Sequence, residues 1–183
     1  MEKTIFESPG KFMVVKSAST TPYFYAERKG MDSVAFILVD NNRTDKYGMV
    51  NERKPPMDHR EGKEVMMETA FGGSNDMIDD EEYIKMSEED VIEHLRELVQ
   101  TEAREESGYR VDLNRIEFVS KELVSTQMNQ YCFMFKVDVT GLEAGERDPQ
   151  NAEEEIAETK WKTLKGVQAT NDWKAKTILF NSI

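Results

Sequence analysis

The pattern of apolar residues along the chain predicts a series of strands. Ser33 to Asp40 is almost continuously apolar, which is typical of a strand that is buried on both faces of a mixed sheet. Further runs with strand composition lie at Phe12–Lys16, Tyr23–Glu27, Tyr47–Glu52, Glu64–Glu68, Ile116–Leu123, Gln130–Val139 and Thr159–Leu164.

Two segments, Ser87 to Ser107 and Asn171 to Ile178, have the spacing of helices. The apolar stripe of the first helix, with intervals of four and three residues, consists of Val91, Leu95 and Leu98. The residues of the second helix that are predicted to face the sheet are Trp173, Thr177 and Phe180. Strands around a long helix, followed by a final helix, predict an α/β protein in which a mixed sheet lies between helices, an α/β/α sandwich.

The apolar stripe of the long helix becomes acidic at its C-terminal end. Glu102 and Glu105 are the next members of the series, and Glu106 lies beside them. At about 100° per residue, the three carboxylates fall within an arc of roughly 100°. Like charges held this close raise one another's pKa and reduce stability, and Mg²⁺ or Mn²⁺ would relieve that repulsion. A solvated acidic end of a surface helix explains the same spacing equally well.

The residues from Glu102 to Tyr109 closely resemble the second half of the Nudix box, G-x5-E-x7-R-E-U-x-E-E-x-G-U, in which U is bulky and aliphatic or similar. The segment EAREESGY contains the paired glutamates, and Gly108 stands where a helix ends in a left-handed turn. The first half departs from the pattern. Thr101 replaces the arginine, Ser87 replaces the glycine, and Glu93, at the first glutamate position, lies on the opposite face of the helix.

A better match for the glycine end lies upstream, in the segment Glu68 to Gly73. This segment looks like the strand and loop that precede the helix in Nudix enzymes of the ADP-ribose pyrophosphatase kind, and it predicts a turn at Gly72-Gly73. An acidic insert from Ser74 to Met86 then separates it from the helix. The motif is interrupted rather than absent.

The resemblance implies a fold and an activity. The fold is the Nudix-type sandwich, and the activity is Mg²⁺-dependent hydrolysis of the pyrophosphate bond in a nucleoside diphosphate derivative, either ADP-ribose-like or a nucleotide sugar. The metal candidates are Glu102, Glu105, Glu106 and the carbonyl beside Gly72. The catalytic candidates are Glu105 and Glu102, with Glu154 or Glu155 from a late acidic loop as general base or further ligand. The candidates for substrate binding are Arg53, Glu68, Gly72 and Gly73.

The first 30 residues are interpreted as a strand extension, and residues 31–183 as the hydrolase domain. In similar enzymes a short N-terminal sheet often forms a dimer contact, so the resemblance implies that a homodimer is possible. The aromatic run of Tyr23, Phe24 and Tyr25 is more typical of strand packing than of stacking on a base.

Composition narrows the classes of partner. The net charge of −12 argues against a broad nucleic-acid surface, but a small nucleotide substrate remains compatible, because metal ions mediate that contact. A single cysteine, Cys132, allows no internal disulfide and is interpreted as an inert core residue. No apolar run approaches the roughly 18 residues of a membrane helix, so a cytoplasmic protein without membrane contact is expected.

Two alternatives to the hydrolase stay open. In the family pattern the missing arginine holds the carboxylates in place, so Thr101 is compatible with a catalytically weak Nudix-fold module that binds a nucleotide or a protein. The other alternative is an unrelated acidic α/β domain whose glutamates face solvent.

Overall fold

The computed structural model describes residues 3–8, 13–17, 23–28, 30, 32–75, 80–149 and 152–181. The strands are β1 (Lys3–Glu7), β2 (Met13–Ser17), β3 (Phe24–Arg28), β4 (Ser33–Val39), β5 (Tyr47–Arg53), β6 (Met66–Thr69), β7 (Phe71–Ser74), β8 (Ile116–Leu123), β9 (Tyr131–Asp138) and β10 (Glu158–Lys162). The helices are α1 (Pro55–Glu61), α2 (Asp80–Tyr83), α3 (Glu88–Ser107), α4 (Ala152–Ile156), α5 (Leu164–Ala169) and α6 (Trp173–Phe180), with a 3-10 turn at Leu113–Arg115.

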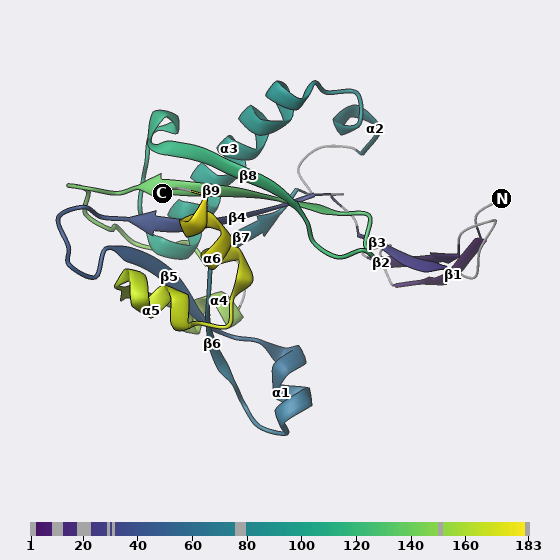
Figure 1. Ribbon diagram of the computed structural model, residues 1–183, viewed down its shortest axis with the longest axis horizontal. Coiled ribbons are helices and arrows are strands. Elements are labelled where there is room, and N and C mark those ends of the chain that lie inside the picture. The colour runs from purple at the N-terminus through teal and green to yellow at the C-terminus, as the bar shows by residue number, and fades with distance from the viewer. Residues whose placement is uncertain are drawn as a thin grey trace.

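The central sheet has seven strands and is organised around β4 (Figure 1). Strand β4 runs parallel to β9, while β10, β5 and β8 extend the sheet in antiparallel pairs. Only the last residues of β4 pair with β5, because the first half of β4 pairs with β7 and the second half of β5 pairs with β6. The glycines predicted to form a turn, Gly72 and Gly73, therefore lie inside a paired strand opposite Ala35 and Val34.

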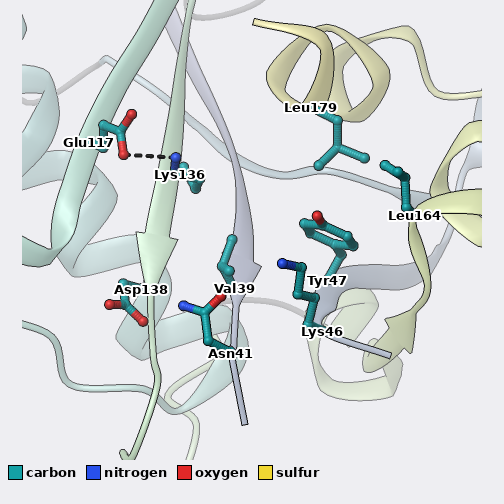
Figure 2. A pocket seen from close by; sticks show the side chains of 9 residues that line it. All are labelled: Val39, Asn41, Lys46, Tyr47, Glu117, Lys136, Asp138, Leu164 and Leu179. Carbon is teal, nitrogen blue, oxygen red and sulfur yellow. Dashed lines mark ion pairs between the residues drawn. The ribbon is translucent and has the colours of Figure 1, made fainter. Parts of the chain in front are cut away.

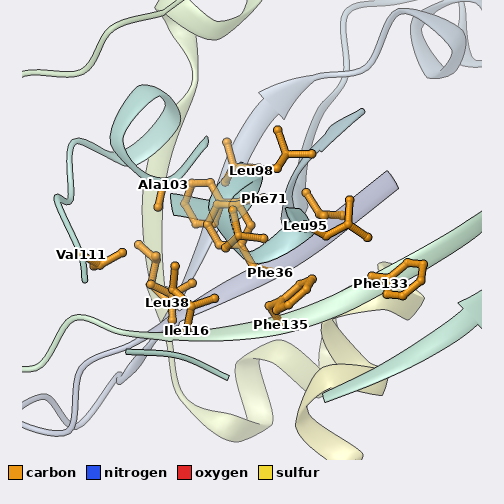
Figure 3. Packing of buried hydrophobic residues seen from close by; sticks show 14 of the residues in the cluster. Phe36, Leu38, Phe71, Leu95, Leu98, Ala103, Val111, Ile116, Phe133 and Phe135 are labelled. Carbon is orange, nitrogen blue, oxygen red and sulfur yellow. The ribbon is translucent and has the colours of Figure 1, made fainter. Parts of the chain in front are cut away.

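Two apolar layers cover the two faces of this sheet. Along β4, Val34, Phe36 and Leu38 belong to the layer beneath α3, and the alternate residues Ala35, Ile37 and Val39 belong to the layer beneath α6. In the first layer, the rings of Phe36 and Phe71 stack at 5.2 Å (Figure 3). The two layers confirm the prediction of a strand buried on both faces in an α/β/α arrangement.

Helix α3 begins and ends as its sequence predicts. Ser87 caps its N-terminus by accepting a hydrogen bond from the backbone N–H of Asp90, and Gly108 ends it in the left-handed region at φ 80°. The predicted switch from an apolar to an acidic face holds for Glu102 and Glu106, which lie against β7, but not for Glu105, which pairs with Arg104. Because a series at intervals of four drifts by about 40° per step, the buried face continues beside the glutamates through Val99, Ala103 and Ser107.

The face that α6 turns toward the sheet also differs from the prediction. Its buried residues are Ala175, Ile178 and Leu179, whereas Trp173 and Phe180 are 42% and 64% exposed. Asp172 caps this helix and also accepts the backbone N–H of Ala70 at 2.7 Å, which sets the rotation of the helix. Within the described residues, no helix combines the length and apolar character that crossing a membrane requires.

The N-terminal strands β1, β2 and β3 form a separate antiparallel sheet at one end of the molecule (Figure 1). Strand β3 joins the rest of the protein through two backbone hydrogen bonds of Ala26, with Gln127 at 2.8 Å and Asn129 at 3.0 Å. Phe6 and Phe24 are 54% and 52% exposed on this sheet. The homodimer contact stays a prediction, as does the domain boundary at residue 30.

Some of the predicted acidic insert is ordered against the domain. Tyr83 of α2 is buried, and its hydroxyl donates to Asp32 at 2.8 Å. His94 of α3 lies nearby and contacts the Asn75 side chain at 2.8 Å. Cys132 is buried beneath α6, and burial raises the pKa of its thiol, as expected for a core residue.

Candidate functional site

A polar pocket of about 300 Å³, here called the Glu106 pocket, lies where β7 and the end of β5 meet the C-terminal half of α3. Its walls also include residues of β3, α4 and α6, so it collects segments that are far apart in the sequence. Its charged lining residues are the acids Glu52, Glu106 and Glu154 and the bases Arg28, Lys54 and Lys174. Carboxylates and cations thus face the same space.

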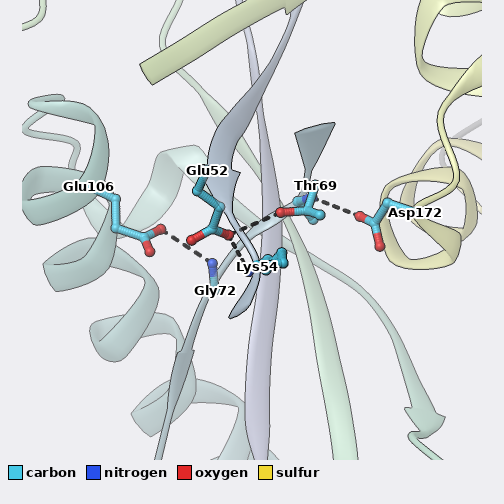
Figure 4. A network of polar contacts seen from close by, with 7 residues as sticks. Glu52, Lys54, Thr69, Gly72, Glu106 and Asp172 are labelled. Atoms are coloured by element: carbon cyan, nitrogen blue, oxygen red, sulfur yellow. Dashed lines mark hydrogen bonds and ion pairs between the residues drawn. The ribbon is translucent and has the colours of Figure 1, made fainter. Parts of the chain in front are cut away.

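Glu106 is the carboxylate whose environment is most unfavourable for its charge. It accepts a hydrogen bond from the backbone N–H of Gly72 at 3.3 Å (Figure 4), which favours the ionised form. Burial nevertheless raises the pKa of this carboxyl well above its ordinary value of 4.5, and the charges of Glu102, Glu52 and Glu154 raise it further. Negative charge is therefore concentrated at this point without enough positive charge to balance it.

The missing side chain of Gly73 allows α3 to approach β7 this closely, and that of Gly72 allows the close contact of β7 with β4. A Cβ atom at Gly73 would lie 2.0 Å from Oε1 of Glu102, and one at Gly72 would lie 2.6 Å from the backbone oxygen of Val34. Glu102 and Glu106, one helical turn apart, therefore both lie against the glycine strand.

A second carboxylate of the pocket, Glu52, is held by polar neighbours. Its Oε1 pairs with the Lys54 ammonium and accepts the hydroxyl of Thr69 at 3.1 Å (Figure 4). Asp172 fixes the adjacent bend of the chain by accepting the N–H of Ala70. These contacts hold the ends of β5 and β6 together at the edge of the pocket.

The predicted site residues divide into two groups. Glu106, Gly72, Gly73 and Glu154 line the pocket, and Glu102 lies against it. The others point elsewhere. Glu105 pairs with Arg104 at 3.0 Å, and the Glu155 side chain is exposed.

Two predicted substrate-binding residues have partners outside the pocket. Arg53 pairs with Asp58 and with Glu64, and Glu68 pairs with Lys162 at 2.5 Å. Neither the Arg53 nor the Glu68 side chain lines the Glu106 pocket. The strand alternation explains this for Arg53, because its neighbours Glu52 and Lys54 take the opposite side.

Three charged residues of the pocket were not predicted, namely Arg28, Glu52 and Lys174. One of them carried a signal in the sequence. Glu52 follows Val50 at the spacing of one strand face, and Val50 belongs to the apolar layer beneath α3. Arg28 and Lys174 have no such signal, because tertiary contacts alone bring β3 and α6 to the pocket.

The carboxylates fit a divalent metal only in part. Among the residues that the structure describes, no three His, Cys, Asp or Glu side chains are arranged to hold an ion by themselves. Mg²⁺, however, commonly keeps several waters and binds through one or two carboxylates together with substrate phosphates. Two carboxylates at the glycine strand, with excess negative charge around Glu106, match that mode of binding.

Comparison with known proteins gives a fold. No protein-family model matches this sequence, and no curated protein matches it. The structure is similar to the crystal structure of an ADP compounds hydrolase, with a TM-score of 0.64 and 14% identity, over 100% of this chain and 89% of that one. An identity this low shows a shared fold and not a shared reaction. The predicted fold class, an α/β/α sandwich with a mixed sheet, is confirmed.

Proposed function

We propose that this protein is a Mg²⁺-dependent hydrolase of the pyrophosphate bond in a nucleoside diphosphate derivative, either ADP-ribose-like or a nucleotide sugar. The main observation behind the proposal is the environment of Glu106. Its carboxylate is buried, lies close to other carboxylates, and accepts a hydrogen bond from Gly72 of β7. Strongly shifted acids in a polar pocket are typical of catalytic or metal sites. The fold shared with a hydrolase of ADP compounds supports the same class of substrate.

Glu102 and Glu106 would hold Mg²⁺, with Mn²⁺ as a substitute. When bound, the metal would neutralise the charge of the pyrophosphate oxygens and lower the pKa of a water molecule that it binds. The carbonyl beside Gly72 and the carboxylate of Glu105 stay predicted ligands. Glu105 would first have to leave its pair with Arg104.

The remaining charged groups of the pocket have complementary roles. Lys174 and Arg28 line the same pocket as the acids and would bind the phosphate that leaves. Lys54 holds Glu52 and adds positive charge to the same edge. Glu154, which lines the pocket where Glu155 does not, is the better placed general base for the attacking water.

An activity screen tests the proposal. Purified protein is incubated with ADP-ribose, NADH, nucleotide sugars and nucleoside triphosphates, with Mg²⁺ or with EDTA, and released nucleoside monophosphate or phosphate is measured. We expect turnover of at least one diphosphate derivative, abolished by EDTA and restored by Mg²⁺ or Mn²⁺. Absence of metal-dependent cleavage across the panel would overturn the proposal.

A catalytically weak nucleotide-binding module is the second candidate. It is favoured by Thr101, whose hydroxyl donates to the backbone oxygen of Glu97, and by the pair of Glu105 with Arg104. This candidate predicts that calorimetry detects binding of a nucleoside diphosphate derivative while the same mixture shows no product.

A further inference from the structure

Arg147 connects the two helices that bring acids to the Glu106 pocket. Its Nη1 lies 2.6 Å from the backbone oxygen of Ala157 and 3.2 Å from that of Glu154. Its Nη2 donates to the backbone oxygen of Glu155 at 3.1 Å. A weaker contact of 3.5 Å joins Nη1 to the backbone oxygen of Glu106, at the end of α3. One guanidinium thus reaches the C-terminal ends of both α3 and α4.

These acceptors lie at or just beyond the C-terminal ends of α3 and α4, where a helix leaves its last carbonyl groups without intrahelical partners. The Glu154 oxygen also accepts the backbone N–H of Ala157 at 3.1 Å. A guanidinium suits these carbonyl groups, because it carries five donors in a fixed plane and its positive charge opposes the negative end of each helix dipole. A lysine ammonium lacks that planar spread, so it would satisfy fewer of the carbonyls at once.

The segment that carries Arg147 is itself attached to α3. The N–H of Gly145 donates to the backbone oxygen of Gly108 at 2.9 Å, and the N–H of Asp148 donates to that of Glu105 at 3.2 Å. A Cβ atom at Gly108 would lie 2.4 Å from the Gly145 oxygen, so the two backbones are in close contact. Arg147 therefore lies on a segment that is hydrogen-bonded to the end of α3, and its side chain extends toward α4.

We propose that Arg147 is a positioning residue that holds α4 against the end of α3, so that Glu154 faces Glu106 across the pocket. Arg147 is not among the residues that line the pocket, and it donates to the backbone oxygens of Glu154 and Glu106. Its effect passes through the backbone of Glu154 and Glu106. The catalytic part of this inference rests on the proposed hydrolase function.

Three variants test the role of Arg147: Arg147→Ala, Arg147→Lys and the control Arg115→Ala. Arg115 is a matched control, because it also donates to two backbone oxygens, those of Asp138 and Thr140, away from the pocket. Measurements are kcat and KM on the substrate found by the screen, and hydrogen exchange of the amides of residues 152–157.

We expect Arg147→Ala to lower kcat by roughly 10- to 100-fold, because a misplacement of about 1 Å costs about 100-fold. KM should change by less than about threefold, since Lys174 and Arg28 are untouched, and amide exchange over residues 152–157 should accelerate. Millimolar guanidinium should restore part of the kcat of Arg147→Ala and leave Arg115→Ala unaffected. Arg147→Lys should fall between wild type and alanine.

The outcomes separate this inference from the proposed function. If wild type cleaves a diphosphate and Arg147→Ala keeps kcat within twofold, the inference is overturned and the function stands. If wild type cleaves no diphosphate, the proposed function is overturned. The exchange rates alone then decide whether Arg147 holds α4 in place. Faster exchange over residues 152–157 then supports it, and unchanged exchange overturns it.

Discussion

Two pockets at opposite ends of β4 have similar volumes and different electrostatics. The Glu106 pocket, of about 300 Å³, adjoins the first residues of β4. A pocket of about 360 Å³ adjoins the end of the strand, and we call it the Asp138 pocket (Figure 2). Its lining residues are Val39, Asn41, Lys46, Tyr47, Glu117, Lys136, Asp138, Leu164 and Leu179.

The charges of the Asp138 pocket are balanced. Lys136 pairs with Glu117 at 2.8 Å. Burial opposes ionisation of Asp138, but hydrogen bonds from Thr140 and the nearby charges of Arg115 and Lys136 hold the pKa of this carboxyl below its ordinary value. The pKa of Glu106 is shifted in the opposite direction, because burial raises it and the neighbouring carboxylates raise it further. Volume therefore does not distinguish the two pockets, whereas unbalanced buried charge does.

The largest expected effect separates the two pockets by activity. Glu106→Gln keeps an acceptor for the Gly72 N–H but removes the charge that would hold Mg²⁺, so kcat should fall by roughly 100- to 1,000-fold. Asp138→Asn in the other pocket should leave kcat within about twofold. Steady-state rates of the two variants decide this, and equal losses would show that the electrostatic contrast has no functional meaning.

A smaller effect is expected from substitutions of the two glycines of β7. Gly73→Ala would push the flexible end of Glu102 away, so kcat should fall by roughly 10- to 100-fold with little change in Tm. Gly72→Ala would meet the backbone of Val34, which cannot move as easily, so it should reduce the free energy of unfolding by about 1–3 kcal/mol. Kinetics and thermal melts of both variants check the pair. Identical behaviour of the two would contradict the placement of Glu102.

The smallest expected effect is on stability without metal. Because the folded-state pKa of Glu106 is raised, ionising this group destabilises the protein. In EDTA, Glu106→Gln should therefore have a higher Tm than wild type at neutral pH. The difference should appear as pH rises from about the ordinary pKa of 4.5 through the raised value, and vanish below that window.

Adding Mg²⁺ should raise the Tm of wild type more than that of Glu106→Gln, because an ion that binds only the folded state stabilises it. Thermal melts across pH, with and without Mg²⁺, measure both differences. A wild type that melts above Glu106→Gln in EDTA at neutral pH would show that the carboxylate is balanced by charges in the folded protein.

The sequence by itself determined the elements whose signals are local. The apolar run from Ser33 predicted a strand with two buried faces, and Ser87 and Gly108 marked the ends of α3. These predictions succeed because burial of a strand and capping of a helix depend on residues a few positions apart. The glutamates before Gly108 likewise lie at the C-terminal end of α3, where Glu106 lines the pocket.

The tertiary structure alone decided which side chains meet. Glu105 and Glu106 are neighbours with the same chemistry, yet one pairs with Arg104 and the other lies against Gly72. Helical periodicity cannot separate them, because both lie within one broad face and only the packing of α3 against β7 distinguishes them. Lys174 and Arg28 reach the pocket through the packing of α6 and β3, and no spacing along the chain encodes a contact between segments so far apart.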